Sequence, residues 1–214
     1  MARGLSKQLV VDAALDALDD VGIDGLTLRV VAARLQVQAP ALYWHLKSKQ
    51  DLLDEMGTEL WRRIFVRLGD DLGSGPWETD MRAMAHAIRA ELLSHRDGAK
   101  VFAGTYLTDP TLLERQESGI EALVADGFTV AGVTQGYSLL YSFTIGFCIE
   151  EQSIAQAGDD RYSLENRAAR VDAAANPLVV ASGEAIFADP DARFADLVDL
   201  VIETVGRIRD RATS

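Results

Sequence analysis

The sequence predicts an all-α fold in which a small N-terminal domain of three helices joins a larger helical domain. Apolar residues recur at helical spacing in nearly every segment of the 214 residues, and no strand-like alternation or internal repeat stands out. Hydrophobic residues make up 48% and charged residues 25%, which are ordinary values for a globular protein with a sizeable core. These values exclude a disordered chain, a collagen-like chain and a disulfide scaffold.

The first fifty residues contain the signals of three helices separated by short breaks. Ser6 can cap the first helix, and apolar side chains follow it at helical spacing. The stretch 21–25 is a break, because its glycines accept backbone conformations that other residues avoid. Thr27 then caps a short second helix that runs to about Leu35, and Pro40 suits the first turn of a third.

The remaining residues predict a second domain over 51–214, which follows a first domain over 1–50. A long helix from residue 48 to about 68 connects the two, and Ser48 with Asp51 forms a capping box at its start.

Beyond a glycine-rich loop at 69–76, the second domain also reads as helical. Ser94 and Asp97 predict a second capping box, whereas residues 153–190 are the least legible part of the chain. Further helices are expected to begin near Pro76, Pro110, Phe128 and Asp191.

Charge is distributed unevenly between the two predicted domains. The 21 Lys and Arg against 33 Asp and Glu give a net charge of −12, which argues against a generally basic, nucleic-acid-coating or membrane-binding surface. Residues 1–50 nevertheless hold six basic and five acidic side chains, and residues 25–50 hold only basic ones. Four of the acids fall within 12–20, on the expected solvent face of the first helix. A cationic unit on an acidic one is typical of a short segment that meets a polyanion.

Two features bear on the cellular compartment. Cys148 is the only cysteine and the N-terminus lacks the apolar core of a secretory signal, so we expect a cytoplasmic protein without disulfides. Residues 127–149 carry no charge, but their Ser, Thr, Gln and Gly make them too polar for a membrane span. We expect this segment to be a helix buried in protein on most sides.

The region 25–50 has the pattern of a helix-turn-helix, whose second short helix enters the DNA major groove. Leu42 and Leu46, one turn apart, should point inward. An aromatic and basic set suited to phosphates and sugars is left outside: Tyr43, Trp44, His45, Lys47 and Lys49. The alternative is a helical surface whose aromatic rings are partly packed on the core.

Several runs carry a resemblance to a known family. Residues 26–35 (LTLRVVAARL) and 40–49 (PALYWHLKSK) resemble the DNA-binding domain of the TetR family of repressors. Further runs resemble the tetracycline-repressor branch, namely 92–101 (LLSHRDGAKV), 143–146 (FTIG), Glu150 and Gln152. The resemblance covers about residues 5–152. It implies a homodimer that binds a palindromic double-stranded DNA operator and is released by a small-molecule effector.

The resemblance assigns DNA contacts residue by residue. It makes Arg29 a guanine reader, which fits the bidentate geometry of arginine with this base. Ala39 and Ala41 stand where tetracycline repressors have a polar pair, so we expect an operator that differs from the tetracycline operator. The implied DNA-binding residues are Thr27, Leu28, Arg29, Ala39, Pro40, Ala41, Tyr43, Trp44, His45 and Lys49.

The resemblance also implies an effector site, which in tetracycline repressors binds a magnesium–tetracycline chelate. Thr105 and Glu150 match that pattern, but Phe102 and Tyr106 replace its metal-ligating histidine and a neighbouring arginine. Phe65, Met84 and Ser142 replace three further polar contacts. The implied ligand-binding residues are Phe65, Met84, Ile88, Phe102, Thr105, Tyr106, Ser118, Ser142 and Glu150.

Because magnesium needs oxygen ligands, we expect a flatter, more apolar effector with no required cofactor and no obligatory magnesium. A true magnesium–tetracycline-responsive repressor of a resistance gene is the alternative, as is a site whose side chains only fill the core.

The second domain shows no credible catalytic or metal-binding set. His86 and His95 lie nine residues apart without a glutamate at metal-ligand spacing, and Cys148 has no base nearby, so a helical enzyme is a remote alternative. The helices at 127–149 and 191–209 are expected to form a four-helix interface between two copies. Gly132, Gly136 and Ser138 would permit the close approach.

Overall fold

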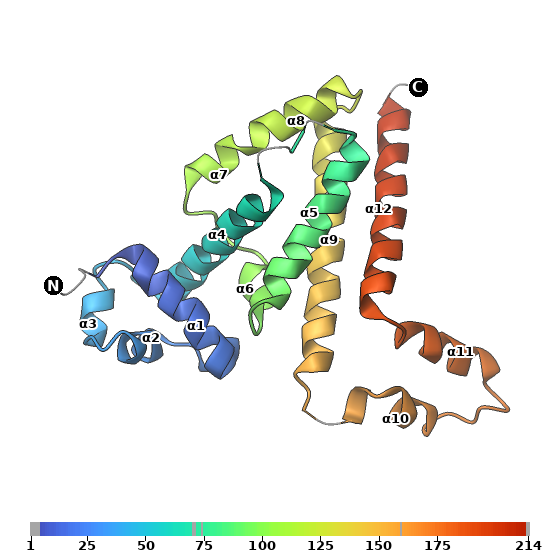
Figure 1. Ribbon diagram of the computed structural model, residues 1–214, viewed down its shortest axis with the longest axis horizontal. Coiled ribbons are helices and arrows are strands. Elements are labelled where there is room, and N and C mark those ends of the chain that lie inside the picture. Colours follow the sequence, from blue (N-terminus) through green and yellow to red (C-terminus); the bar gives the residue numbers. More distant parts are fainter. Residues whose placement is uncertain (1–4, 70–71, 74, 159, 213–214) are drawn as a thin grey trace.

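The computed structural model describes residues 5–69, 72–73, 75–158 and 160–212. Every regular element within these ranges is a helix, which confirms the predicted all-α fold (Figure 1). The elements in chain order are α1 (Lys7–Gly25), α2 (Leu28–Arg34), α3 (Ala39–Leu42), α4 (Lys49–Leu68), α5 (Trp77–Leu93), α6 (Gly98–Phe102), α7 (Pro110–Glu114), α8 (Gln116–Ala125), α9 (Val130–Ala155), the 3-10 helix η1 (Asp160–Tyr162), α10 (Leu164–Ala168), α11 (Pro177–Ile186) and α12 (Pro190–Ala212).

The N-terminal helices begin where their capping residues predict. The Ser6 hydroxyl accepts a hydrogen bond from the Leu9 amide at 3.2 Å, and the Thr27 hydroxyl accepts one from the Val30 amide at 3.2 Å. The predicted break falls at Gly22, whose φ of 69° and ψ of 172° bend α1 before its last turn.

The long connecting helix α4 also begins at its predicted capping box. The Asp51 amide donates to the Ser48 hydroxyl at 3.0 Å, and that hydroxyl donates to the Asp51 carboxylate at 2.7 Å. The helix packs against α1 on one side and against α5 and α6 on the other, so it belongs to the cores of both domains.

The body of the second domain consists of α5, α9 and α12, which lie alongside one another in Figure 1. The Arg89 guanidinium fastens the three helices together, because it lies 2.7 Å from the carboxylates of Glu151 and Asp191. These ion pairs hold the pKa of Arg89 well above its ordinary value.

One expectation about the body is wrong in detail. Gly132 and Gly136 do not face outward: a Cβ on Gly136 would lie 2.9 Å from Cγ1 of Val205 in α12 of the same chain. They therefore permit close packing within one chain, whereas Ser138 is exposed. The uncharged segment is buried along one face of α9 only, and the opposite face is open.

The second predicted capping box is also wrong. The Ser94 hydroxyl donates to the Glu91 carbonyl oxygen at 2.7 Å instead of capping α6. Asp97 takes a left-handed backbone with φ of 56°, and its side chain makes contacts elsewhere. In the predicted loop at 69–76, Asp70, Asp71 and Ser74 lie outside the described residues.

The stretch between α9 and α12, whose structure the sequence does not predict clearly, forms an arm, which we define as residues 160–187. In the arm, α10 and α11 pack against each other and project from the end of the body (Figure 1). No helix among the residues that the structure describes has the length and apolar character needed to cross a membrane.

Candidate nucleic-acid interface and effector site

The tip formed by α2, α3 and the turn after α3 presents aromatic and basic side chains on a small core. Leu42 and Leu46 point inward, with 0% and 1% of their surface exposed, as predicted. Trp44 is 90% exposed and Tyr43 is 55% exposed, although large rings are usually at least partly covered. Neither ring therefore contributes much buried surface to the core of the N-terminal domain.

The other predicted DNA-binding residues occupy the same tip with different exposure. Leu28 is buried, so its side chain belongs to the core. Thr27, Arg29, Pro40 and Lys49 are exposed. Ala39, Ala41 and His45 are half-buried.

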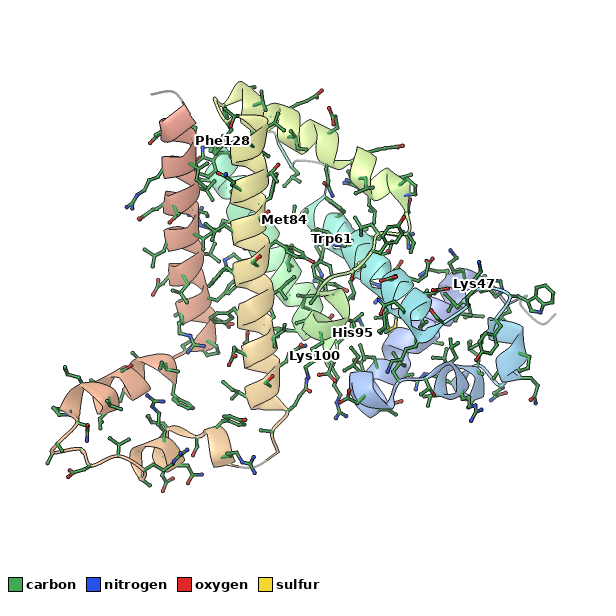
Figure 2. All side chains as sticks on the ribbon, turned by 180° about the vertical axis from the view of Figure 1, so that it is seen from behind. Lys47, Trp61, Met84, His95, Lys100 and Phe128 are labelled. Carbon is green, nitrogen blue, oxygen red and sulfur yellow. The ribbon has the colours of Figure 1, made fainter. Side chains whose placement is uncertain are left out.

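The basic side chains of the N-terminal domain divide into paired and unpaired groups. Arg34 is neutralised by Asp20 and Asp16, and Lys7 lies 2.7 Å from Glu55. Among the described residues, Arg29 and Lys47 form no ion pair, and Figure 2 shows Lys47 at the end of the molecule far from α9 and α12.

Lys49 donates to the Ile23 carbonyl oxygen at 2.7 Å, which holds its charge beside the last turn of α1. Asp16, Asp19 and Asp20 lie on the exposed face of α1 as predicted, and Asp16 and Asp20 pair there with Arg34. Within the described part of the chain, no carboxylate pairs with Arg29 or Lys47, so positive charge remains at the tip.

We predict that Trp44→Ala weakens operator binding about tenfold without loss of stability. The exposed indole stacks on no aromatic ring or cation among the described residues, so its removal should change the free energy of unfolding by less than about 0.5 kcal/mol. Binding titration and urea denaturation measure the two effects. An equal affinity in both proteins would remove Trp44 from the interface.

The predicted effector residues Phe65 and Phe102 belong to an aromatic cluster, which we define as Trp61, Phe65, Phe102 and Tyr141. The Trp61 ring lies 4.8 Å from Phe102, 5.7 Å from Phe65 and 6.1 Å from Tyr141 between centroids. The Tyr141 hydroxyl donates to the Phe102 carbonyl oxygen at 3.3 Å. Figure 2 shows Trp61 between α4 and α9.

Sequence reasoning missed Trp61 and Tyr141. Trp61 lies four residues before Phe65, a spacing that places both rings on one face of α4 and could have revealed it. Tyr141 comes from a helix far along the chain, and only the fold brings it to the cluster.

The other predicted effector residues separate into buried and exposed groups. Met84 and Ile88 lie in the core that surrounds the cluster, and Thr105 packs over Gly57, where a Cβ would lie 2.1 Å from the threonine hydroxyl. The surface group does not join them: Tyr106 (74% exposed), Ser118, Ser142 and Glu150.

One buried hydroxyl near the cluster lacks a partner. Thr144 is 0% exposed, and its Oγ1 makes no hydrogen bond with any described residue. It lies three residues after Tyr141, on the same face of α9. A buried hydroxyl without a partner is costly, so the hydrogen-bonding capacity of this atom is left unused by the described residues.

Cys148, the only cysteine of the chain, is buried. Burial raises the pKa of the Cys148 thiol to about 12, so this group stays protonated and unreactive. The described residues contain no group of three His, Cys, Asp or Glu side chains placed to hold a metal ion.

The two domains meet at a junction that we define as Asp19, Ile23, His95, Arg96 and Asp97. His95 Nδ1 lies 3.0 Å from the Asp19 carboxylate, which also accepts from the Arg96 amide at 2.8 Å. The Ile23 amide donates to the Asp97 carboxylate at 3.0 Å, directly after the kink in α1. In Figure 2, His95 lies where the N-terminal domain meets the second.

Gln152 connects the same turn to α9. Its side-chain amide donates to the carbonyl oxygens of Leu92 and His95 at 2.8 and 2.7 Å, and its oxygen accepts from the Ala99 amide at 3.1 Å. Hydrogen bonds therefore run from α1, through the turn before α6, to the helix that carries Tyr141 and Thr144.

Comparison with known proteins gives matches over nearly the whole chain. The family model "Bacterial regulatory proteins, tetR family" matches residues 10–56, and "Tetracyclin repressor-like, C-terminal domain" matches residues 69–206. A relative from Escherichia coli, tetracycline repressor protein class A from transposon 1721, is 34% identical over 211 residues, covering 96% of this chain and 92% of its own.

Solved structures of TetR regulators also superpose on this chain. A possible TetR family transcriptional regulator from Streptomyces coelicolor A3(2) superposes with a TM-score of 0.83 at 32% identity, over 95% of this chain and 100% of that one. The Q116A variant of TetR from Acinetobacter baumannii AYE, solved with minocycline, gives a TM-score of 0.74 at 31% identity, over 96% and 98%.

Proposed function

The chain belongs to the TetR family of bacterial regulatory proteins, and we propose that it represses transcription by binding a palindromic operator as a homodimer until a small, largely apolar or aromatic effector releases it. It is a ligand-responsive transcriptional regulator. The observation that carries the operator-binding part is the tip, where Trp44 is 90% exposed and Arg29 has no ion-pair partner among the described residues.

The aromatic cluster supports an apolar or aromatic effector. Four rings from α4, α6 and α9 offer flat surfaces, and the Thr144 hydroxyl offers one unpaired polar group. The A. baumannii neighbour was solved in complex with minocycline, a ligand of several fused rings. Phe102 and Tyr106 at the positions of a metal ligand and an arginine support an effector that needs no magnesium.

The junction supports a route from effector to operator. An effector that spreads Trp61, Phe102 and Tyr141 would displace α6 and the turn before it, which hold α1 through Asp97 and Asp19. Release requires the effector to bind the DNA-incompetent arrangement more tightly than the competent one. The open faces of α9 and α12 are the surfaces that we assign to the homodimer.

We predict that Arg29→Ala weakens operator binding by roughly 1–3 kcal/mol and relaxes specificity at one base pair. Selection of bound sequences from a random DNA pool identifies the operator, and titration of both proteins on operator and random DNA measures the change. The matched control is Arg34→Ala, because that guanidinium is already paired with Asp16 and Asp20. Equal losses on both DNAs would contradict base reading by Arg29.

We predict that planar aromatic compounds raise the melting temperature without magnesium. Ligand binding to the native state stabilises it by mass action, so thermal-shift titration with minocycline and with metal-free aromatic compounds reports the site directly. Trp61→Ala, which removes the central ring of the cluster, should abolish the shift. Stabilisation by minocycline only when magnesium is present would favour the tetracycline-responsive alternative.

A further inference from the structure

The ring of His95 lies at the junction and bonds to two different helices. Its Nδ1 lies 3.0 Å from the Asp19 carboxylate of α1, and its Nε2 lies 3.3 Å from Nη1 of Arg63 in α4. The side chain is only 12% exposed, so it is enclosed where the two domains meet (Figure 2). The ring therefore attaches the turn before α6 to α1 and to α4 at once.

The two partners assign one protonation state to the ring. An ionised carboxylate only accepts hydrogen bonds, and a guanidinium only donates them. Nδ1 of His95 must therefore carry the proton that is donated to Asp19, while Nε2 must be the unprotonated nitrogen that accepts from Arg63. This arrangement fits the neutral imidazole, in one of its two tautomers.

A second proton on His95 would remove one of these two bonds. The proton would bind to Nε2 and point at Nη1 of Arg63, so that two donors and two positive charges would face each other across 3.3 Å. The contact with the Asp19 carboxylate would become an ion pair and would strengthen. Protonation therefore weakens the attachment of the turn to α4 and keeps its attachment to α1.

Arg63 is held in place beside the ring. Its Nη2 lies 3.1 Å from the Asp12 carboxylate of α1, and its Nε lies 3.1 Å from the carboxylate of Glu59, one turn earlier in α4. The guanidinium therefore cannot turn away without breaking these ion pairs. Because Asp12, Glu59 and Asp19 surround the two cations, the positive charge of a protonated ring is accommodated although its bond to Arg63 is lost.

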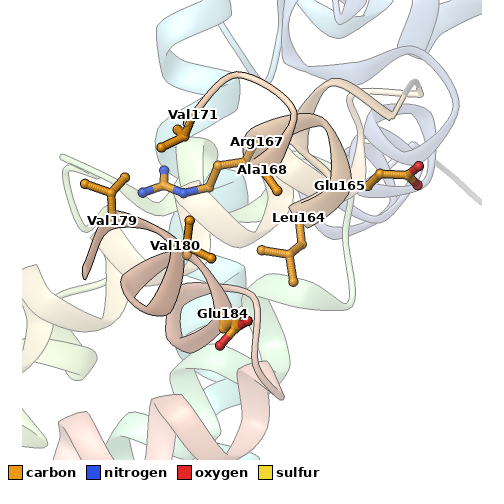
Figure 3. Close-up of a pocket in the computed structure, with 9 residues that line it drawn as sticks. Leu164, Glu165, Arg167, Ala168, Val171, Val179, Val180 and Glu184 are labelled. Carbon is orange, nitrogen blue, oxygen red and sulfur yellow. The ribbon is translucent and has the colours of Figure 1, made fainter. Parts of the chain in front are cut away.

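The other polar groups around the turn have partners of their own. The Arg96 guanidinium donates to the Asp20 carbonyl oxygen at 3.3 Å, and the Asp97 carboxylate lies 2.8 Å from Lys100 Nζ. From α9, the neutral side-chain amide of Gln152 bonds to the backbone of the turn. The arm, with its cavity between α10 and α11 (Figure 3), contributes no described residue to these bonds. Protonation of the ring therefore acts on the contact with α4.

We propose that His95 makes operator binding sensitive to pH, because its protonation in mildly acidic solution breaks the bond to Arg63 and detaches the turn before α6 from α4. Histidine is the side chain that ordinarily changes charge between pH 5 and 8, so a modest acidification acts on it. The turn then stays on α1 through Asp19, while the helix that carries Trp61 and Phe65 is free to shift against it. This inference rests on the proposed operator-binding function and adds an input to it besides the effector.

Acidification should weaken operator binding through this junction. A junction that lacks one of its bonds populates more orientations of the tip, and only the orientation that fits the operator binds, so the apparent affinity falls with the population of that orientation. Positive charge gained elsewhere, as on His45 in the tip, acts in the opposite direction because it favours binding to phosphates. The two effects therefore differ in sign.

The test is an operator titration of the full chain at constant salt, at about pH 7.5 and about pH 5.5. His95→Gln carries a neutral amide that can donate to Asp19 and accept from Arg63 at both pH values. The ratio of the two affinities, wild type over variant, removes the contributions of His45 and of the DNA itself. We expect this ratio to fall about fivefold at the lower pH. His95→Lys is charged at both pH values and should bind the operator weakly at both.

The control is His86→Gln, which replaces an exposed histidine of α5 and should keep the wild-type pH dependence. Nitrogen-15 NMR of the His95 ring tests the switch without DNA, because Nε2 should be unprotonated at about pH 7.5 and protonated at about pH 5.5. An unchanged affinity ratio, or an Nε2 with the same protonation state at both pH values, would overturn the proposal. Absence of operator binding at both pH values would instead contradict the proposed function, and the ring NMR would then show whether the switch exists without it.

Discussion

Gly98→Ala is expected to destabilise the protein by about 3 kcal/mol, although the substitution adds a single methyl group. A Cβ on Gly98 would lie 2.3 Å from the carbonyl oxygen of Leu92 and 3.2 Å from its carbonyl carbon. These are backbone atoms at the end of α5, and they cannot rotate away as a side chain can. The methyl group would therefore separate α5 from α6 at the turn that holds the domain junction.

Urea denaturation at neutral pH measures this effect from the unfolding midpoint and slope. Gly206→Ala is the matched control, because a Cβ there would meet only the Trp77 ring at 3.7 Å, an ordinary contact. It lies inside α12, where alanine is favoured over glycine by roughly 0.5–1 kcal/mol. Equal stabilities of Gly98→Ala and wild type would mean that the turn adjusts without strain.

The capping sites illustrate how much of the fold can be predicted from sequence. Ser6, Thr27 and Ser48 cap helices as expected, because each cap is formed by residues three positions apart. Ser94 and Asp97 have the same spacing, yet the Asp97 carboxylate binds the amide of Ile23, which is 74 residues away in sequence. A long-range contact replaced the local one, and the sequence pattern contains no sign of it.

The tip and the aromatic cluster also differ in how far the sequence predicts them. The tip is predictable because Leu42 and Leu46 fix one face of a short local segment, which leaves Tyr43 and Trp44 outside. The aromatic cluster is only half predictable, since Tyr141 joins it through the packing of α9. The glycines at 132 and 136 signal close approach correctly, but the sequence does not say that the neighbour is α12 of the same chain.

Asp97→Asn should lower the free energy of unfolding by about 2–3 kcal/mol and loosen the junction between the domains. The carboxylate is buried and accepts from the Ile23 amide at 3.0 Å and from Lys100 Nζ at 2.8 Å. Asparagine tolerates the left-handed backbone at φ of 56°, so this substitution tests charge and not strain. Loss of the charge-assisted bond should also speed hydrogen exchange of the Ile23 amide.

The difference in stability between wild type and Asp97→Asn should depend on pH, because only the wild-type side chain titrates. Burial alone would raise the pKa of its carboxyl, but hydrogen bonds from Lys100 and Ile23 outweigh burial and hold the pKa below the ordinary value of 3.8. A lowered native pKa stabilises the fold above the ordinary value, and this contribution disappears as the pH falls through the lowered one. The stability difference between wild type and Asp97→Asn should therefore begin to shrink as the pH falls below 3.8 and should vanish only below the lowered pKa of Asp97.

Lys100→Met separates the junction from the local ion pair. The substitution removes the Lys100 ammonium group, which pairs with Asp97 from a side chain that is 43% exposed, and it leaves the hydrogen bond between Asp97 and the Ile23 amide. It should therefore lower the free energy of unfolding by less than about 1 kcal/mol. Exchange of the Ile23 amide, followed by mass spectrometry on peptides that contain it, should stay slow in Lys100→Met and become fast in Asp97→Asn. If both variants protect Ile23 as wild type does, Asp97 does not join the domains, and the route from effector to operator must run through Asp19 and His95 instead.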